Sequence, residues 1–170
     1  MRILFTDEHP LMHKLPEYDV ISDPKLFRST AIDPEDPDSS DYRLKPILLE
    51  NDVDIVVLVN LWQVINGEMI WFHQSSFRSW RSSLNGKLVI AASLTDPFVF
   101  NENMKMTRRC IGKIDHCNLY VTQDMDTAIK ASKYYRVAHF DGENADPFRM
   151  ALKATIQNPR ISGDPDSPYI

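Results

Sequence analysis

The stretch Val53-Asp-Ile-Val-Val-Leu-Val-Asn60 decides the fold of this chain. It is a continuous apolar run that ends at a polar residue, and it lacks the alternation of a strand that faces water on one side. Four further runs have the same form: Arg2-Ile-Leu-Phe-Thr-Asp-Glu8, Lys87-Leu-Val-Ile-Ala-Ala-Ser-Leu-Thr-Asp96, Asn118-Leu-Tyr-Val-Thr-Gln-Asp124 and Arg136-Val-Ala-His-Phe-Asp141. Continuous runs are typical of strands buried on both faces, as in a parallel sheet covered by helices.

Segments with helical spacing separate these runs. A further short strand is expected around Tyr18 to Ile21, and Asp146-Pro147 predicts an N-cap followed by proline at the first helical position. Helices are expected over 42–51, 70–84, 104–114 and 146–157, and a further helix, capped by Asp126 or Asp124, is expected to run to Tyr134. Strands that alternate with helices predict an α/β fold, a Rossmann-like three-layer sandwich with a five- or six-stranded, mostly parallel sheet.

The sequence predicts a single domain. Residues 1–157 are expected to form it, with an exposed acidic loop at 33–41 that carries five acids and no base. Residues 158–170 hold three prolines and one glycine, which predicts an extended C-terminal tail.

The composition is that of a soluble globular protein, with 43% hydrophobic and 25% charged residues among 170. The net charge of −5 argues against a general nucleic-acid or membrane-surface binder, because both partners are anionic. Cys110 and Cys117 do not form a disulfide or zinc pattern, which favours free thiols in a reducing cytoplasm. No apolar stretch approaches the roughly 20 residues that span a bilayer. Neither G-x-G-x-x-G nor a P-loop lysine motif occurs, so no nucleotide cofactor is expected.

Polar residues collect where the apolar runs end, and open α/β sheets bind ligands outside the carboxyl ends of their strands. Asp7, Glu8 and His9 follow the first run. Histidine titrates near neutrality, so His9 is a candidate catalytic base, with Asp7 and Glu8 as candidate substrate-binding residues. A plain polar loop in which Pro10 holds His9 explains the same residues. No metal site is expected, because no partner motif rich in His or Asp lies elsewhere.

Two other ends of runs carry candidates on the same predicted edge. Asp96 ends the run 87–96 and is the second candidate catalytic residue, while Asp141 and Asn144 stand at and after the end of the last run as candidate substrate-binding residues. A carboxylate beside a histidine can orient it as a base. The alternative is that Asp96 only caps a helix or a turn.

The segment from Ser93 to Phe148 resembles the N-terminal half of two-domain (GT-B) glycosyltransferases, particularly the spore-maturation type. The resemblance rests on Leu94-Thr-Asp-Pro-Phe98, Ile114-Asp-His-Cys-Asn-Leu-Tyr-Val-Thr-Gln-Asp124 and Val137-Ala-His-Phe-Asp-Gly-Glu-Asn-Ala-Asp-Pro-Phe148. It implies that Asp96 lies near a sugar or other small-molecule acceptor and that His9 stands where several inverting members keep a base. The family's glycine-rich turn and its sugar-nucleotide-binding half have no counterpart here. The resemblance therefore implies action with a separate donor-binding subunit, or a half that has lost catalysis, and a homo-oligomer is a further expectation.

The N-terminal part also resembles response-regulator receiver domains. The residues concerned are Arg2-Ile-Leu-Phe-Thr-Asp-Glu-His-Pro-Leu11, Asp54-Ile-Val-Val-Leu-Val-Asn60 and Tyr120-Val-Thr-Gln123. Val59 or Asn60 stands where that family has its phosphoacceptor aspartate, and Gln123 stands where it has lysine. The resemblance therefore implies a degenerate receiver, a non-catalytic module for protein contacts.

Overall fold

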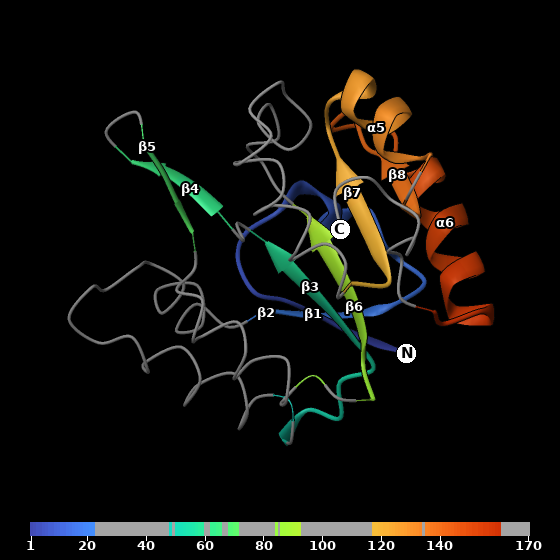
Figure 1. Cartoon of the computed structure of the whole chain (residues 1–170). Helices are drawn as coiled ribbons and strands as arrows, with labels where there is room; N and C mark the ends of the chain where they lie inside the picture. Colours follow the sequence, from blue (N-terminus) through green and yellow to red (C-terminus); the bar gives the residue numbers. More distant parts are fainter. Residues whose placement is uncertain are drawn as a thin grey trace.

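The computed structural model describes residues 1–22, 48, 50–59, 84, 86–92, 117–133 and 135–160, and the backbone of strands at 62–65 and 68–71. Its centre is a six-stranded sheet in which every neighbouring pair is parallel, in the order β2-β1-β3-β6-β7-β8 (Figure 1). The strands are β1 Arg2–Phe5, β2 Asp19–Ser22, β3 Ile55–Val59, β6 Leu88–Ala92, β7 Leu119–Thr122 and β8 Val137–His139. The predicted α/β class, the Rossmann-like sandwich and the parallel arrangement are thereby confirmed.

Two α-helices follow the last two strands, and both contact β7 and β8. Helix α5 (Met125–Ala131) has Asp124 as its N-cap, and Oδ2 of Asp124 accepts a hydrogen bond from the Thr127 amide at 2.9 Å and one from the Thr127 hydroxyl. Helix α6 (Asp146–Gln157) has the predicted bounds, but its N-cap is Ala145. The prediction that Asp146 caps this helix was therefore wrong by one residue: the Asp146 amide donates to Oδ1 of Asn144 at 3.0 Å.

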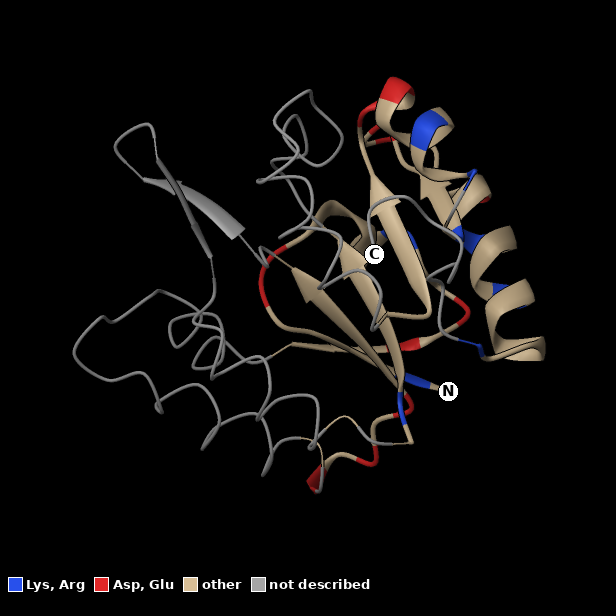
Figure 2. Ribbon diagram, viewed as in Figure 1, with Lys and Arg blue, Asp and Glu red and all other residues tan. Residues whose placement is uncertain are grey.

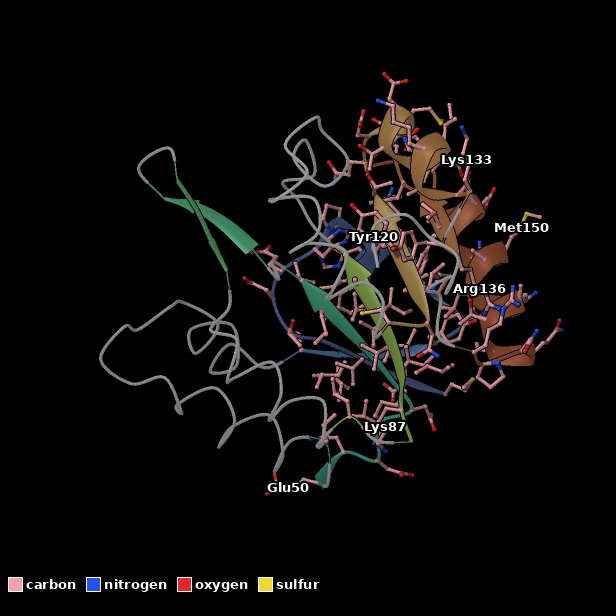
Figure 3. The ribbon with its side chains drawn as sticks, viewed as in Figure 1. Glu50, Lys87, Tyr120, Lys133, Arg136 and Met150 are labelled. Carbon is pink, nitrogen blue, oxygen red and sulfur yellow. The ribbon has the colours of Figure 1, made fainter. Side chains whose placement is uncertain are left out.

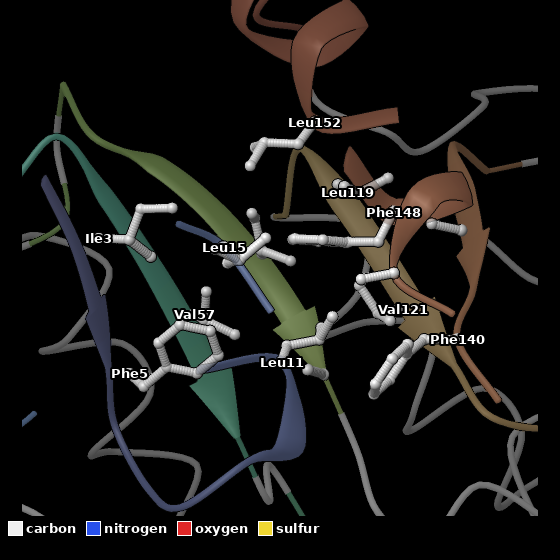
Figure 4. Close-up of a cluster of buried hydrophobic side chains, with 14 of the residues drawn as sticks. Ile3, Phe5, Leu11, Leu15, Val57, Leu119, Val121, Phe140, Phe148 and Leu152 are labelled. Carbon is white, nitrogen blue, oxygen red and sulfur yellow. The ribbon is translucent and has the colours of Figure 1, made fainter. Parts of the chain in front are cut away.

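The hydrophobic core lies on both faces of the sheet, as continuous apolar strands require. On one face, side chains of the strands pack against Leu11 and Leu15 from the β1–β2 connection and Phe148 and Leu152 from α6 (Figure 4). The alternate side chains, which point to the opposite face, are also buried; Tyr120 is the largest of them (Figure 3). The buried alternate residues are Leu4, Val56, Leu58, Val89, Ala91 and Tyr120.

The connection from β1 to β2 is compact. Its only helical segment is the four-residue 3-10 helix η1 (Pro10–His13). Leu11 and Leu15 are both buried, so this short segment covers the sheet where a longer crossover helix would otherwise lie. The connection is also joined to α6 by an ion pair between Glu17 and Arg149 at 2.6 Å.

The amino ends of the strands are tied together by polar contacts. Arg2 pairs with Asp19 of β2 at 2.6 Å, and its guanidinium also donates to the Asn51 carbonyl. After α6 the chain returns to this edge, where Nδ2 of Asn118 donates to the Arg160 carbonyl at 3.1 Å. A guanidinium N–H of Arg136, labelled in Figure 3, donates to the Asn158 carbonyl at 2.9 Å.

A separate two-stranded sheet pairs β4 (Trp62–Ile65) with antiparallel β5 (Glu68–Trp71). Ile70 lies in β5 opposite Gln63, so the prediction that a helix begins at Ile70 was wrong. The other predictions for 33–41, for 104–114 and for most of 42–51 and 70–84 fall outside the described residues, as do those for Asp96, Cys110 and residues 161–170. Leu48 and Glu50 are helical, and Cys117 is a buried free cysteine.

Candidate functional site

The strand order turns back at the carboxyl ends of β1 and β3, because the chain leaves β1 to form β2 on one side and later returns to form β3 on the other. Such switch points are where open parallel sheets bind ligands. Thr6 joins the two strands here. Its amide donates to the Val57 carbonyl at 3.0 Å, and its Oγ1 accepts from the Val59 amide at 3.0 Å. Thr6 is fully buried, so these bonds fix the base of the site.

His9 connects this switch point to the edge of the sheet that β8 forms. Its ring centroid lies 6.2 Å from that of Phe5, at the end of β1, and 6.0 Å from that of Phe140, directly after β8. The strands β3, β6 and β7 lie between β1 and β8 in the sheet. The loop after β1 therefore reaches the loop after β8, and His9 is the contact between them.

The surroundings of His9 determine the charge and the tautomer of its imidazole. The residue is only 2% exposed, and burial lowers the pKa of its imidazole to about 4, so the ring is neutral at pH 7. As the N-cap of η1, its Nδ1 accepts a hydrogen bond from the Leu11 amide at 3.2 Å. An amide N–H can only donate, so Nδ1 is unprotonated and the neutral ring carries its proton on Nε2. His9 thus offers a donor, whereas the predicted base would need a free basic nitrogen; its catalytic role stays a prediction.

Asp141 and Asn144 build the turn between β8 and α6. Oδ1 of Asp141 accepts from the amides of Glu143 at 2.9 Å and Asn144 at 2.8 Å, and these bonds hold the pKa of Asp141 below its usual value. Gly142 between them has a φ of +99°, a conformation that favours glycine. Asn144 in turn accepts from the Asp146 amide. Asp141 and Asn144, two of the four predicted substrate-binding residues, therefore use part of their hydrogen-bonding capacity within the turn.

Asp7 and Glu8 lie immediately before His9. Oδ1 of Asp7 accepts from the Glu8 amide at 2.7 Å, and the Glu8 side chain is exposed. The contact between His9 and Phe140 places these acids in the loop adjoining Asp141. Four of the predicted site residues besides His9 therefore belong to two adjoining loops, whereas the position of Asp96 lies outside the described residues.

The described carboxyl edge, which we define as residues 6–9, 123–126 and 140–145, is acidic. It contains no lysine or arginine, and its acids are red in Figure 2. They are Asp7, Glu8, Asp124, Asp126, Asp141 and Glu143. Hydrogen bonds from Thr127 lower the pKa of Asp124 as well, so the edge is negatively charged at neutral pH. Within the part of the chain that the structure describes, no group of three or more His, Cys, Asp or Glu residues is arranged to hold a metal ion.

A pocket of about 440 Å³ lies at the opposite, amino edge of the sheet. Asp54, Lys87 and Asn118, which line it, directly precede β3, β6 and β7. None of the predicted site residues lines this pocket. It therefore stands apart from the carboxyl edge to which the sequence points.

Thr6 and the two phenylalanines were not among the predicted site residues. Thr6 follows the first strand directly, and a hydroxyl at that position is the signal that marks it. Phe5 and Phe140 end or follow apolar runs, and nothing in their local sequence distinguishes them from ordinary core residues.

Comparisons of the chain with models of protein families, with curated proteins and with solved structures found no match in any of the three. Among the helices of the described residues, none has the length and apolar character that crossing a bilayer requires.

Proposed function

We propose that this chain is a binding domain that takes up an acceptor molecule at the carboxyl edge of its sheet, in the manner of the acceptor half of a GT-B glycosyltransferase. The observation that supports this most is the contact of His9 with both Phe5 and Phe140. It brings the loop after β1 beside the loop after β8, so polar groups from two distant strands serve one surface. The sheet order supports the same location, because the switch point lies between β1 and β3.

The groups on this edge suit recognition of a molecule with several hydrogen-bonding groups. Carboxylates from both loops can accept hydrogen bonds from a ligand, and Nε2 of His9 can donate one. In this proposal Asp96 is the base that deprotonates the acceptor, because Nδ1 of His9 is already occupied by the Leu11 amide. The nucleotide sugar would be bound by a separate subunit, and transfer would invert the sugar.

The test uses melting temperatures of the purified chain with a nucleotide sugar, alone and mixed with a candidate donor-binding subunit. A rise is expected only in the mixture. Transfer in that mixture should be lost in Asp96→Asn. The double variant Glu8→Gln and Glu143→Gln should bind the acceptor more weakly, whereas Glu50→Gln, an exposed acid outside this edge, is the matched control. A shift with the chain alone, or full transfer by Asp96→Asn, contradicts the proposal.

A second candidate is a non-catalytic protein-interaction module of degenerate receiver type. The observation in its favour is the strand order: counted along the chain without the β4–β5 hairpin, the first five strands lie in the order 2-1-3-4-5 of flavodoxin-like folds. The sixth strand, β8, is an addition at the edge. Val59 at the end of β3 is buried and apolar, so it cannot accept a phosphoryl group.

This module predicts a stable complex with a protein partner and no melting-temperature shift with any nucleotide sugar. Because like charges repel, its partner at the acidic edge would be basic rather than a second copy of the same edge. Light scattering at low and high salt measures whether the chain self-associates through another surface. A small-molecule shift without any protein complex argues against this candidate.

A further inference from the structure

One buried polar atom at the carboxyl edge, Nε2 of His9, has no hydrogen-bonding partner among the described residues. His9 is 2% exposed, and the hydrogen bond from the Leu11 amide leaves the proton of the neutral ring on Nε2. A buried N–H that has lost water without gaining an acceptor is unfavourable, and native proteins satisfy nearly all such groups with protein or with a bound molecule. This donor therefore needs an oxygen acceptor.

The surroundings of His9 indicate where that acceptor lies. The two nitrogens sit on different sides of the imidazole ring, and Nδ1 is directed to the first turn of η1, so Nε2 points away from it. The rings of Phe5 and Phe140 both lie close to the imidazole and carry no acceptor of their own. An acceptor would thus be held between two loops, at the edge where the strands end.

The charge of the edge limits the chemical class of the molecule. The described loops carry six acids and no lysine or arginine, and the neutral His9 adds no positive charge. A phosphate or carboxylate bound against these described loops would meet repulsion, and no lysine or arginine within them would offset it. A neutral molecule meets none, and its N–H or O–H groups can donate to the carboxylates while one of its oxygens accepts from His9.

We propose that Nε2–H of His9 donates a hydrogen bond to a hydroxyl or carbonyl oxygen of a neutral ligand bound at the carboxyl edge. In this role His9 is a positioning residue, which orients the ligand and takes no proton from it. The inference rests on the proposed function, since it assumes that the same edge is the binding surface, and it adds the ligand class and the atom that contacts it.

The first test uses the wild-type protein with ¹⁵N-labelled histidine at pH 7. NMR spectra are expected to show the Nε2–H tautomer of His9. Acetamide, which is neutral and has both a carbonyl and an amide, and acetate, an anion of the same size, are titrated separately. Fragments this small bind weakly, so both are taken to high millimolar concentration. Acetamide should shift the Nε2 resonance of His9 saturably, and acetate should require at least a tenfold higher concentration.

Two variants separate the cap from the donor. His9→Asn keeps a side-chain oxygen near the position of Nδ1, so it can still accept from the Leu11 amide, but it has no group at the position of Nε2. His9→Gln places an amide N–H₂ near the position of Nε2. The backbone amide of Phe140 reports binding in both. Acetamide should no longer shift it in His9→Asn, whereas His9→Gln should bind acetamide within a few-fold of the wild type.

Three results overturn the inference. They are an Nδ1–H tautomer of His9 at pH 7, an affinity for acetate equal to that for acetamide, or an Nε2–H that is already hydrogen-bonded within the protein and that neither probe shifts. The wild-type measurements decide the matter even if a variant fails to fold. The outcome is separable from that of the proposed function. Acetamide binding with no nucleotide-sugar effect in any mixture removes the glycosyltransferase proposal and leaves the His9 contact standing.

Discussion

Lowering the pH from 7 to 5 is expected to destabilise this protein through one buried imidazole, that of His9. Burial lowers the pKa of His9 from 6.5 to about 4 in the folded chain, because the charged ring would be shielded from water, with the rings of Phe5 and Phe140 close to it. In the unfolded chain the ring is hydrated and protonates near its ordinary value. The unfolded state therefore gains a proton first as the pH falls.

The size of the effect follows from this difference. A depressed histidine pKa stabilises the folded state fully above the unfolded pKa, and the contribution is lost as the pH falls through 6.5 towards 4. The pKa difference corresponds to about 3 kcal/mol in total, of which about 2 kcal/mol is lost by pH 5. Protonation would also remove the acceptor of the Leu11 amide, since both ring nitrogens then donate.

Urea unfolding of the wild type and of His9→Asn at several pH values between 7 and 5 measures this effect. The variant cannot titrate at this position but can still cap η1, so the other histidines and carboxylates contribute equally to both proteins. The free energy of unfolding of the wild type should fall by about 2 kcal/mol more than that of the variant over this interval. Parallel curves for the two proteins, or an NMR titration of His9 near 6.5, would refute the reasoning.

Three further predictions concern stability. Leu11→Ala should lower the free energy of unfolding by about 2–5 kcal/mol in urea titrations, because Leu11 is fully buried. The control Met150→Ala, at a 73% exposed position, should change it by about 0.5 kcal/mol or less. Thr6→Val keeps the shape but leaves the Val59 amide without its acceptor, so it should cost about 1–3 kcal/mol and speed hydrogen exchange of that amide; unchanged exchange would contradict the role given to Thr6. Asp124→Ala removes the cap of α5 and should cost about 1 kcal/mol, with a loss of helical circular dichroism on heating that Asp126→Ala does not reproduce.

The main sheet could be predicted from the sequence because its strands are buried on both faces and therefore read as unbroken apolar runs. The β4–β5 hairpin could not be predicted from that pattern. Ile70 stands seven residues before Phe77, a spacing that helices also produce, so the apolar pattern predicts a helix there. The dipeptide Asn66-Gly67 between the two short strands is the stronger signal, since it favours a two-residue hairpin turn.

The candidate site was predictable in location and less so in detail. The ends of the predicted strands indicated the edge at which the site lies, because parallel strands bring their carboxyl ends together. The burial of His9 was not apparent, since its neighbours Asp7, Glu8 and Pro10 suggest an exposed loop. Its burial depends on Phe140, which lies more than a hundred residues further along the chain and is brought to it only by the complete sheet.

The order of the strands in the parallel sheet also affects how the chain folds during its synthesis. Strand β1 can pair with β2 early, but its other neighbour is β3, and the amide of Arg2 reaches its partner Asp54 across 52 residues. Until that distant segment leaves the ribosome, β1 has one unpaired edge, because β3 has not yet been synthesised. Pairings this remote slow folding and leave apolar segments open to aggregation. This protein is therefore expected to depend more on chaperones during translation than a helical bundle of equal size.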